Sequence, residues 1–186
     1  MILRVSSAVV VCALACSGAR AYFTANLAFG SPQDSIGTFG FAFNDTLTFN
    51  FGAPIQIIGV GWDTTLHTFG NSWASDAHIA FSDGGTGPGA TLLLDVNPGS
   101  GIDAPAPSSG IHFTVQPIKL ADIGIPDINI NSGILQFEFY ESVDDILGAD
   151  AQWNSTITVL YNVLPSPATW CPFALGLAAL SRRRRA

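Results

Sequence analysis

Acidic side chains are concentrated in two loops of this 186-residue chain. The oxygen ligands they offer are Asp144, Asp145 and Asp150 in one loop, and Asp95, Asn97 and Asp103 in the other. Such loops can gather the roughly 6 to 8 oxygen ligands that Ca²⁺ takes, although neither spacing is that of an EF-hand. Ca²⁺ is therefore the candidate cofactor, with Asp144, Asp145 and Asp150 as its candidate ligands. The alternative is a solvated acidic loop.

The chain has three histidines, His67, His78 and His112. His67 and His78 flank one loop and could share a metal ion with Asp76. The alternative is that they sit at strand ends and make local hydrogen bonds. Glu138 and Glu141 lie three positions apart on a predicted strand, so their side chains point to opposite faces. That spacing argues against a glycosidase carboxylate pair.

The usual catalytic motifs are missing from the sequence. It contains no H-E-x-x-H, no G-x-S-x-G and no P-loop, and residues 22–164 contain no cysteine. We therefore predict a non-enzymatic protein. A secreted hydrolase stays open as an alternative, because the members of a Ser-His-Asp site need only meet in space.

Three tryptophans, Trp62, Trp73 and Trp153, fall near predicted strand ends or loops. Indole rings on a β-sandwich can stack against sugars, so a carbohydrate-binding module, with an extracellular polysaccharide as partner, is a further alternative. Packing in the core is the other use of these side chains.

The C-terminal residues 165–186 have three parts in a fixed order. Pro165, Ser166 and Pro167 come first, and an apolar stretch covers residues 168–180. The basic cluster that follows is Arg182, Arg183, Arg184 and Arg185. The apolar stretch is shorter than the roughly 20 residues of a comfortable membrane span, which suits transient retention. The arginines would stay on the cytoplasmic side and leave residues 22–164 outside.

This tail resembles the PEP-CTERM sorting signal of Gram-negative bacteria, in a Pro-Ser-Pro variant of the commoner Pro-Glu-Pro form. The resemblance implies a membrane-embedded cysteine protease, exosortase, as partner. It also implies transient anchoring in the inner membrane, followed by release to the cell surface or extracellular matrix.

The N-terminal residues 1–21 have the pattern of a secretory signal peptide. Arg4 precedes an apolar run, and Ala19-Arg20-Ala21 forms an A-x-A site for signal peptidase. We expect cleavage after Ala21. A lipoprotein signal ending at Cys16 is the alternative.

The segment between the two ends, residues 22–164, is strongly acidic. It holds all 14 acidic residues of the chain and a single basic residue, Lys119. Such a charge repels phosphate backbones, so we expect no nucleic-acid partner. At this length one hydrophobic core can suffice without disulfides.

The same segment is predicted to form one all-β domain, an antiparallel β-sandwich or jelly roll with essentially no helix. Apolar residues alternate in Leu47-Thr48-Phe49 and in Leu135-Gln136-Phe137, so one face of each strand should enter the core and the other should meet water. Residues 84–89 and 97–110 are predicted loops. The predicted strands are 22–29, 38–43, 46–51, 55–62, 78–81, 91–96, 112–115, 134–141 and 156–162.

A second resemblance covers roughly residues 46–161. Residues 57–68, which include His67, are followed by Ser75-Asp76, by residues 137–142 and by Trp153 before the last predicted strand. This order resembles the proprotein-convertase P domain. The resemblance implies a jelly-roll sandwich that serves as an accessory module.

Overall fold

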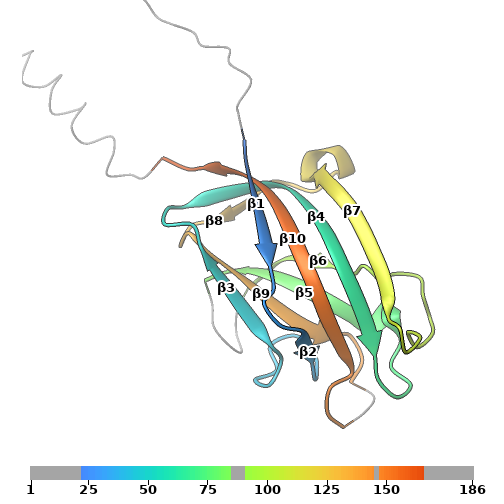
Figure 1. Ribbon diagram of the computed structural model, residues 1–186. Coiled ribbons are helices and arrows are strands. Elements are labelled where there is room, and N and C mark those ends of the chain that lie inside the picture. The colour runs from blue at the N-terminus through green and yellow to red at the C-terminus, as the bar shows by residue number, and fades with distance from the viewer. Residues whose placement is uncertain (1–21, 85–90, 145–146, 166–186) are drawn as a thin grey trace, which may run out of the picture.

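Two antiparallel β-sheets pack face to face in the computed structural model, which describes residues 22–84, 91–144 and 147–165 (Figure 1). The six-stranded sheet has the order β1-β10-β4-β7, with β2 paired to β10 and β8 paired to β4, and the four-stranded sheet has the order β3-β9-β5-β6. The strands are β1 Phe23–Ala28, β2 Gln33–Ser35, β3 Thr46–Asn50, β4 Ile55–Thr68, β5 Ala77–Asp83, β6 Leu92–Val96, β7 Ile111–Lys119, β8 Ile128–Ile130, β9 Ile134–Glu141 and β10 Ala151–Val163. The predicted all-β, antiparallel architecture is confirmed.

The helical content of the described ranges is two short 3₁₀ turns, η1 Ala74–Asp76 and η2 Leu120–Ile123. None of the helices in these ranges is long and apolar enough to cross a membrane. The predicted signal peptide, residues 1–21, and the predicted C-terminal hydrophobic helix lie outside the described residues.

The long strands β4 and β10 form the centre of the larger sheet. They run antiparallel from the pair Thr68 and Ala151 to the pair Ile55 and Val163. The sequence predicted only the apolar half of each strand, because the other half carries hydroxyl and amide side chains. Thr64 and Ser155 are nevertheless buried, at 1% and 4% exposure, and their hydroxyls bond to each other. A buried polar pair that satisfies itself costs little, so both strands continue.

Phenylalanine rings fill the space between the sheets. β9 places Leu135, Phe137 and Phe139 in the core, where all three are fully buried. The ring of Phe137 lies 4.7 Å from that of Phe81 on β5 and 5.8 Å from that of Phe29 after β1. Burial of each such side chain contributes about 1.5–3 kcal/mol, which is the main source of stability where disulfides are absent.

The outer face of β9 is buried as well, contrary to the predicted contact with water. Gln136 and Glu138 are only 0% and 3% exposed. The connection between β2 and β3 covers this face: the Gly40 N–H donates to Oε1 of Glu138 at 2.6 Å, and Nδ2 of Asn44 donates to the same oxygen at 2.8 Å. The alternation was predicted correctly, but a loop replaces water on the polar side.

The predicted strand 38–43 is wrong, because this stretch is a loop. Oδ1 of Asn44 accepts hydrogen bonds from the N–H groups of Ile36 and Gly37, at 3.0 and 2.9 Å, and closes the chain on itself. Gly40 has a φ of 84°, a conformation that a strand does not use. The three-residue strands β2 and β8 were not predicted, since so few residues show no periodicity.

Candidate functional site

Of the predicted sorting motif, the structure describes Pro165 alone. This residue is exposed and follows directly on β10, whose last pair is Val163 with Ile55. Leu164 is held by a hydrogen bond from its N–H to the carbonyl of Pro54, at 2.8 Å. The other residues of the two predicted export signals lie outside the described residues: Ala19, Ala21, Ser166, Pro167, Arg182, Arg183, Arg184 and Arg185.

The predicted calcium ligands differ in their surroundings. Asp144 is exposed, Asp150 is fully buried, and Asp145 lies outside the described residues. The backbone of Asp150 bonds to two neighbouring segments. Its N–H donates to the carbonyl oxygen of Ser35, and its carbonyl oxygen accepts from the N–H of Phe69, both at 2.8 Å. Within the part of the chain that the structure describes, no group of three His, Cys, Asp or Glu side chains is placed to hold a metal ion.

The structure also separates the histidines that were candidates for a shared metal. His67 is on β4 in the larger sheet, and His78 is on β5 in the smaller one. Asp76 accepts a hydrogen bond from Ser142 instead, at 3.2 Å. His112 contacts Asp63 at 2.6 Å on the exposed side of β7.

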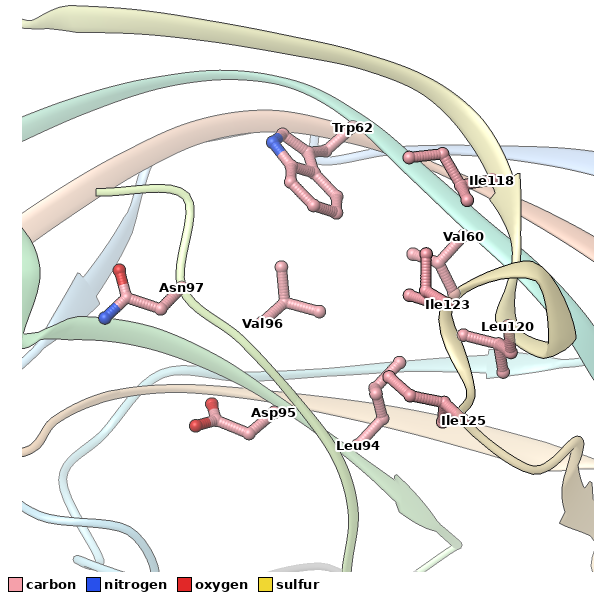
Figure 2. Close-up of a pocket in the computed structure, with 10 residues that line it drawn as sticks. All are labelled: Val60, Trp62, Leu94, Asp95, Val96, Asn97, Ile118, Leu120, Ile123 and Ile125. Carbon is pink, nitrogen blue, oxygen red and sulfur yellow. The ribbon is translucent and has the colours of Figure 1, made fainter. Parts of the chain in front are cut away.

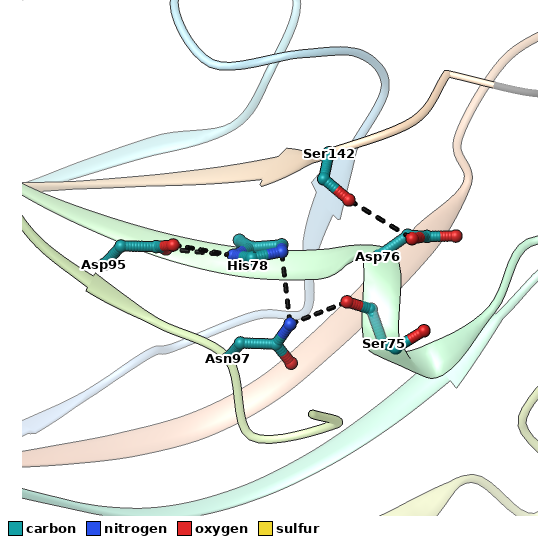
Figure 3. A network of polar contacts seen from close by, with 6 residues as sticks. All are labelled: Ser75, Asp76, His78, Asp95, Asn97 and Ser142. Atoms are coloured by element: carbon teal, nitrogen blue, oxygen red, sulfur yellow. Dashed lines mark hydrogen bonds and ion pairs between the residues drawn. The ribbon is translucent and has the colours of Figure 1, made fainter. Parts of the chain in front are cut away.

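A polar network centred on His78 lies on the outer face of the smaller sheet, the face turned away from the core (Figure 3). Nδ1 of His78 lies 3.0 and 2.9 Å from the two carboxylate oxygens of Asp95 on the neighbouring strand β6. Nε2 lies 3.1 Å from Nδ2 of Asn97, and the same Nδ2 donates to the carbonyl of Ser75 at 2.6 Å. The ring of Tyr140 lies against the imidazole, with 5.1 Å between centroids.

These contacts place the proton of His78. Nδ2 of Asn97 can only donate, so Nε2 of the imidazole accepts and the ring proton sits on Nδ1, facing Asp95. A histidine held by a carboxylate resembles two members of a catalytic triad. Here the place of the nucleophile is taken by an amide that blocks Nε2. The arrangement therefore orients a neutral histidine and does not leave it available as a general base.

Sequence reasoning placed Asp95 and Asn97 in a candidate site but did not connect them to His78. The connection depends on the pairing of β5 with β6, in which Ile79 lies opposite Val96 and Ala80 lies opposite Asp95. No local pattern gives that register, because the sequence between the two strands is rich in glycine and shows no periodicity.

Burial raises the pKa of Tyr140 above its ordinary value, and the carboxylates of Asp95 and Glu138 raise it further. The folded protein thus favours the neutral phenol. We expect stability to be unaffected by this group below about pH 10 and to fall as the pH rises further, because the unfolded chain ionises first. Urea midpoints measured from about pH 8 to pH 11 test this.

Tyr140→Phe should flatten that alkaline decline, since phenylalanine has no proton to lose. Tyr22→Phe is the matched control, because Tyr22 is 44% exposed and should leave the decline unchanged. An equally steep decline in the Tyr140→Phe variant would contradict the prediction.

A cavity of about 170 Å³ lies between the sheets, bounded by β4 and β7 of one sheet and by β6 of the other (Figure 2). Trp62 forms part of its wall, so this indole contacts the cavity rather than a sugar-binding surface. Trp153 is fully buried in the core, and Trp73 is 45% exposed. Of the three tryptophans considered for sugar stacking, Trp73 is the most exposed.

Comparisons with known proteins identify no family. No protein-family model matches the chain, and no curated protein matches it. The structure of the infectious bursal disease virus Gx strain is similar with 13% sequence identity and a TM-score of 0.33, covering 79% of this chain and 34% of the viral one. The crystal structure of the infectious bursal disease virus VP2 subviral particle gives 15% identity and a TM-score of 0.32, covering 77% and 33%. This chain thus spans about a third of those viral chains, and similarity at this level carries no functional conclusion.

Proposed function

We propose that this protein is an exported, non-enzymatic β-sandwich that an exosortase-type membrane protease sorts to the cell surface or extracellular matrix. The observation that carries the proposal is the order of residues 165–186: Pro-Ser-Pro, then an apolar stretch, then four arginines. In this proposal signal peptidase removes residues 1–21, and the apolar stretch then anchors the chain transiently in the inner membrane until the protease acts.

The fold supports this proposal through the position of its last strand. β10 pairs with β1 up to Phe23 and Tyr161, so the described chain starts and finishes at the same end of the sandwich (Figure 1). The last described residue, Pro165, is exposed there. Proline removes a backbone donor and disfavours helix in the residue before it, which keeps the start of the motif extended. An exposed, extended segment next to a folded domain is what a protease requires.

The non-enzymatic part of the proposal is supported by the His78 network. Asp95 and His78 have the geometry of a proton-transfer pair, but Asn97 occupies Nε2. We also propose that the sandwich is a jelly roll of the P-domain kind that acts as an accessory binding or structural module. Carbohydrate or Ca²⁺ binding remains the second candidate within this class.

The mass of the mature protein tests the sorting proposal. In cells with the sorting protease we expect a chain that begins at Tyr22 and ends within or close to Pro165–Pro167. Replacing Arg182 to Arg185 with serine should weaken membrane retention and processing, because the positive charges hold the C-terminus inside. Pro165→Ala combined with Pro167→Ala should leave insertion intact and block cleavage.

Cells without the protease provide the control, in which the unprocessed chain should accumulate in the membrane. An exported protein that retains its C-terminus through Ala186 in normal cells would overturn the sorting proposal. A lipid-modified Cys16 at the mature N-terminus would overturn cleavage after Ala21. The sandwich should fold in every variant, because all these changes lie at or beyond the end of β10.

A further inference from the structure

A polar trough of about 280 Å³ lies on the outer face of the larger sheet, the face turned away from the core. The polar side chains that line it come from four neighbouring strands, β1, β10, β4 and β7: Asn26, Thr156, Thr158, Asp63, Thr114 and Gln116. In Figure 1 the larger sheet lies in front of the smaller one, so this face is turned toward the viewer. The trough is separate from the His78 network, which belongs to the smaller sheet.

The strand register places these side chains on the outer face. Ile157 of β10 is fully buried in the core, so Thr156 and Thr158 on either side of it point outward. Asp63 of β4 lies opposite Thr156, and Thr114 of β7 lies opposite Asp63. Because directly opposite residues in neighbouring strands share a face, the polar groups of three adjacent strands point into the same trough.

A glycine allows the backbone of β7 to form one wall of the trough. Gly61 lies opposite Thr158, so a side chain at this position would point outward. A Cβ atom there would lie 2.6 Å from the nitrogen of Pro117 and 2.7 Å from the carbonyl oxygen of Val115. The bulge of β7 therefore leans over β4 on the outer side and stands above the face. Thr158 and Asn26 bound the opposite side.

The side chains of the trough offer both donors and acceptors. Oγ1 of Thr158 donates to Oδ1 of Asn26 at 3.0 Å, which leaves Nδ2 of Asn26 as a donor. Oδ1 of Asp63 contacts Nε2 of His112 at 2.6 Å, which leaves Oδ2 as an acceptor. Three further side chains make no hydrogen bond to any described residue: Thr114, Gln116 and Thr156. Because all these groups project from paired strands, they are held in place before a ligand arrives.

The chemistry of the trough selects a class of ligand. Residues 22–164 carry fourteen acidic side chains and one lysine, and this field repels anions. A cation would find a single carboxylate, that of Asp63, which is already in contact with His112. An apolar ligand would remove water from hydroxyl and amide groups without replacing their hydrogen bonds. Sugar hydroxyls both donate and accept, as do the hydroxyl and amide side chains of the trough.

The polar face continues beyond the trough along the two central strands. Thr65 of β4 lies opposite Asn154 of β10, and His67 lies opposite Gln152. These residues alternate with buried ones, so they point outward as well. A long chain of sugars that leaves the trough would therefore stay in contact with hydrogen-bonding side chains.

We propose that this trough binds a neutral polysaccharide, whose sugar rings lie along β4 and whose hydroxyls bond to side chains of β10 on one side and of β7 on the other. The inference deepens the carbohydrate-binding candidate of the proposed function, and it rests on export for the place where the polysaccharide is met. Specificity for uncharged sugars follows from the hydroxyl and amide lining together with the acidic field.

Native electrophoresis of the purified full chain, in gels that contain a soluble polysaccharide, measures the binding. The neutral probes are dextran, laminarin, galactomannan and arabinoxylan, and polygalacturonate is the anionic probe. We expect at least one neutral polysaccharide to retard the protein in a saturable way and polygalacturonate to leave its mobility unchanged. Failure of all four neutral probes, or equal retardation by polygalacturonate, would overturn the proposal.

Paired variants locate the binding. Thr156→Val combined with Thr158→Val removes two hydroxyls, keeps the branched shape that suits a strand, and should weaken binding at least about tenfold. Thr46→Val combined with Thr48→Val is the matched control, because both residues are exposed on β3 of the smaller sheet. Gln116→Leu removes an exposed amide from the opposite wall and should also weaken binding. Urea unfolding verifies that each variant folds, and equal binding by all of them would refute the site.

The binding test and the sorting test can fail separately. Electrophoresis uses the purified chain and needs no membrane protease. A protein that is processed in cells but binds none of the neutral probes would remove this inference and leave the sorting proposal. A protein that binds a neutral polysaccharide but keeps its C-terminus in normal cells would do the reverse.

Discussion

Trp153→Ala should lower the free energy of unfolding by about 3–5 kcal/mol, the range found when a large aromatic side chain is removed from a core. Trp153 is fully buried on β10, between its partners Leu66 on β4 and Gln33 on β2. Its ring lies 6.3 Å from that of Phe139 on the opposite sheet. Alanine would leave a cavity at the point where both sheets meet. Since domains are stable by only about 5–15 kcal/mol, a large part of the total would be lost.

Urea denaturation followed by circular dichroism measures this loss. The matched control is Trp73→Ala, which removes the same side chain from a position that is 45% exposed. Its effect should stay within about 0.5 kcal/mol, as for most surface substitutions. If the two variants were destabilised equally, Trp153 would not be the core residue that the structure shows.

Gly61→Ala should be the second most damaging change, with an expected loss of about 1–3 kcal/mol. A Cβ atom at Gly61 would lie 2.6 Å from the nitrogen of Pro117 and 2.7 Å from the carbonyl oxygen of Val115. Both are backbone atoms of β7, so no side chain can turn away to relieve the contact. The strands β4 and β7 would have to separate at the bulge that positions Ile118.

Gly30→Ala is the control for Gly61→Ala. A Cβ atom at Gly30 would meet nothing within 4 Å, and its φ is not positive. This variant should be neutral or slightly more stable, by up to about 1 kcal/mol, because alanine restricts the unfolded chain. Thermal unfolding compares the two variants, and amide hydrogen exchange on β7 should accelerate in Gly61→Ala alone. Equal stability of the two variants would contradict the prediction, because it would mean that the backbone of β7 shifts away from the added Cβ atom at no cost.

The local patterns of the sequence were sufficient for the all-β class and for most strands. In β9, predicted and observed boundaries agree at 134–141, because Leu135, Phe137 and Phe139 recur at every second position. β3 was found in the same way. Such alternation depends only on the two-residue period of a strand, which neighbours in sequence reveal. The absence of cysteine from residues 22–164 likewise excluded disulfides there without any structure.

The predictions that failed concern residues whose partners are distant in sequence. The stretch 38–43 looks like a strand, but Glu138 accepts a hydrogen bond from the N–H of Gly40, and Asn44 accepts from the N–H groups of Ile36 and Gly37 just before the stretch. These contacts bend the chain into a loop. Glu138 is nearly a hundred residues away, so no local signal carries that contact. The polar ends of β4 and β10 were missed for the same reason, since Thr64 and Ser155 are acceptable in the core only as a pair.

What the sequence by itself determined about this protein is its class, its acidic charge and the order of chemical types along the tail. These depend on composition and on neighbours along the chain. The candidate site was decided by tertiary structure alone. The pairing of β5 with β6 brings Asp95 and Asn97 to His78, and the overhang of β7 beyond β6 leaves Ile118 uncovered. The register of two strands within a sheet and the overlap of two packed sheets both depend on contacts between residues far apart in sequence. A one-residue shift of the β5–β6 register would turn the side chains of β6 to the other face.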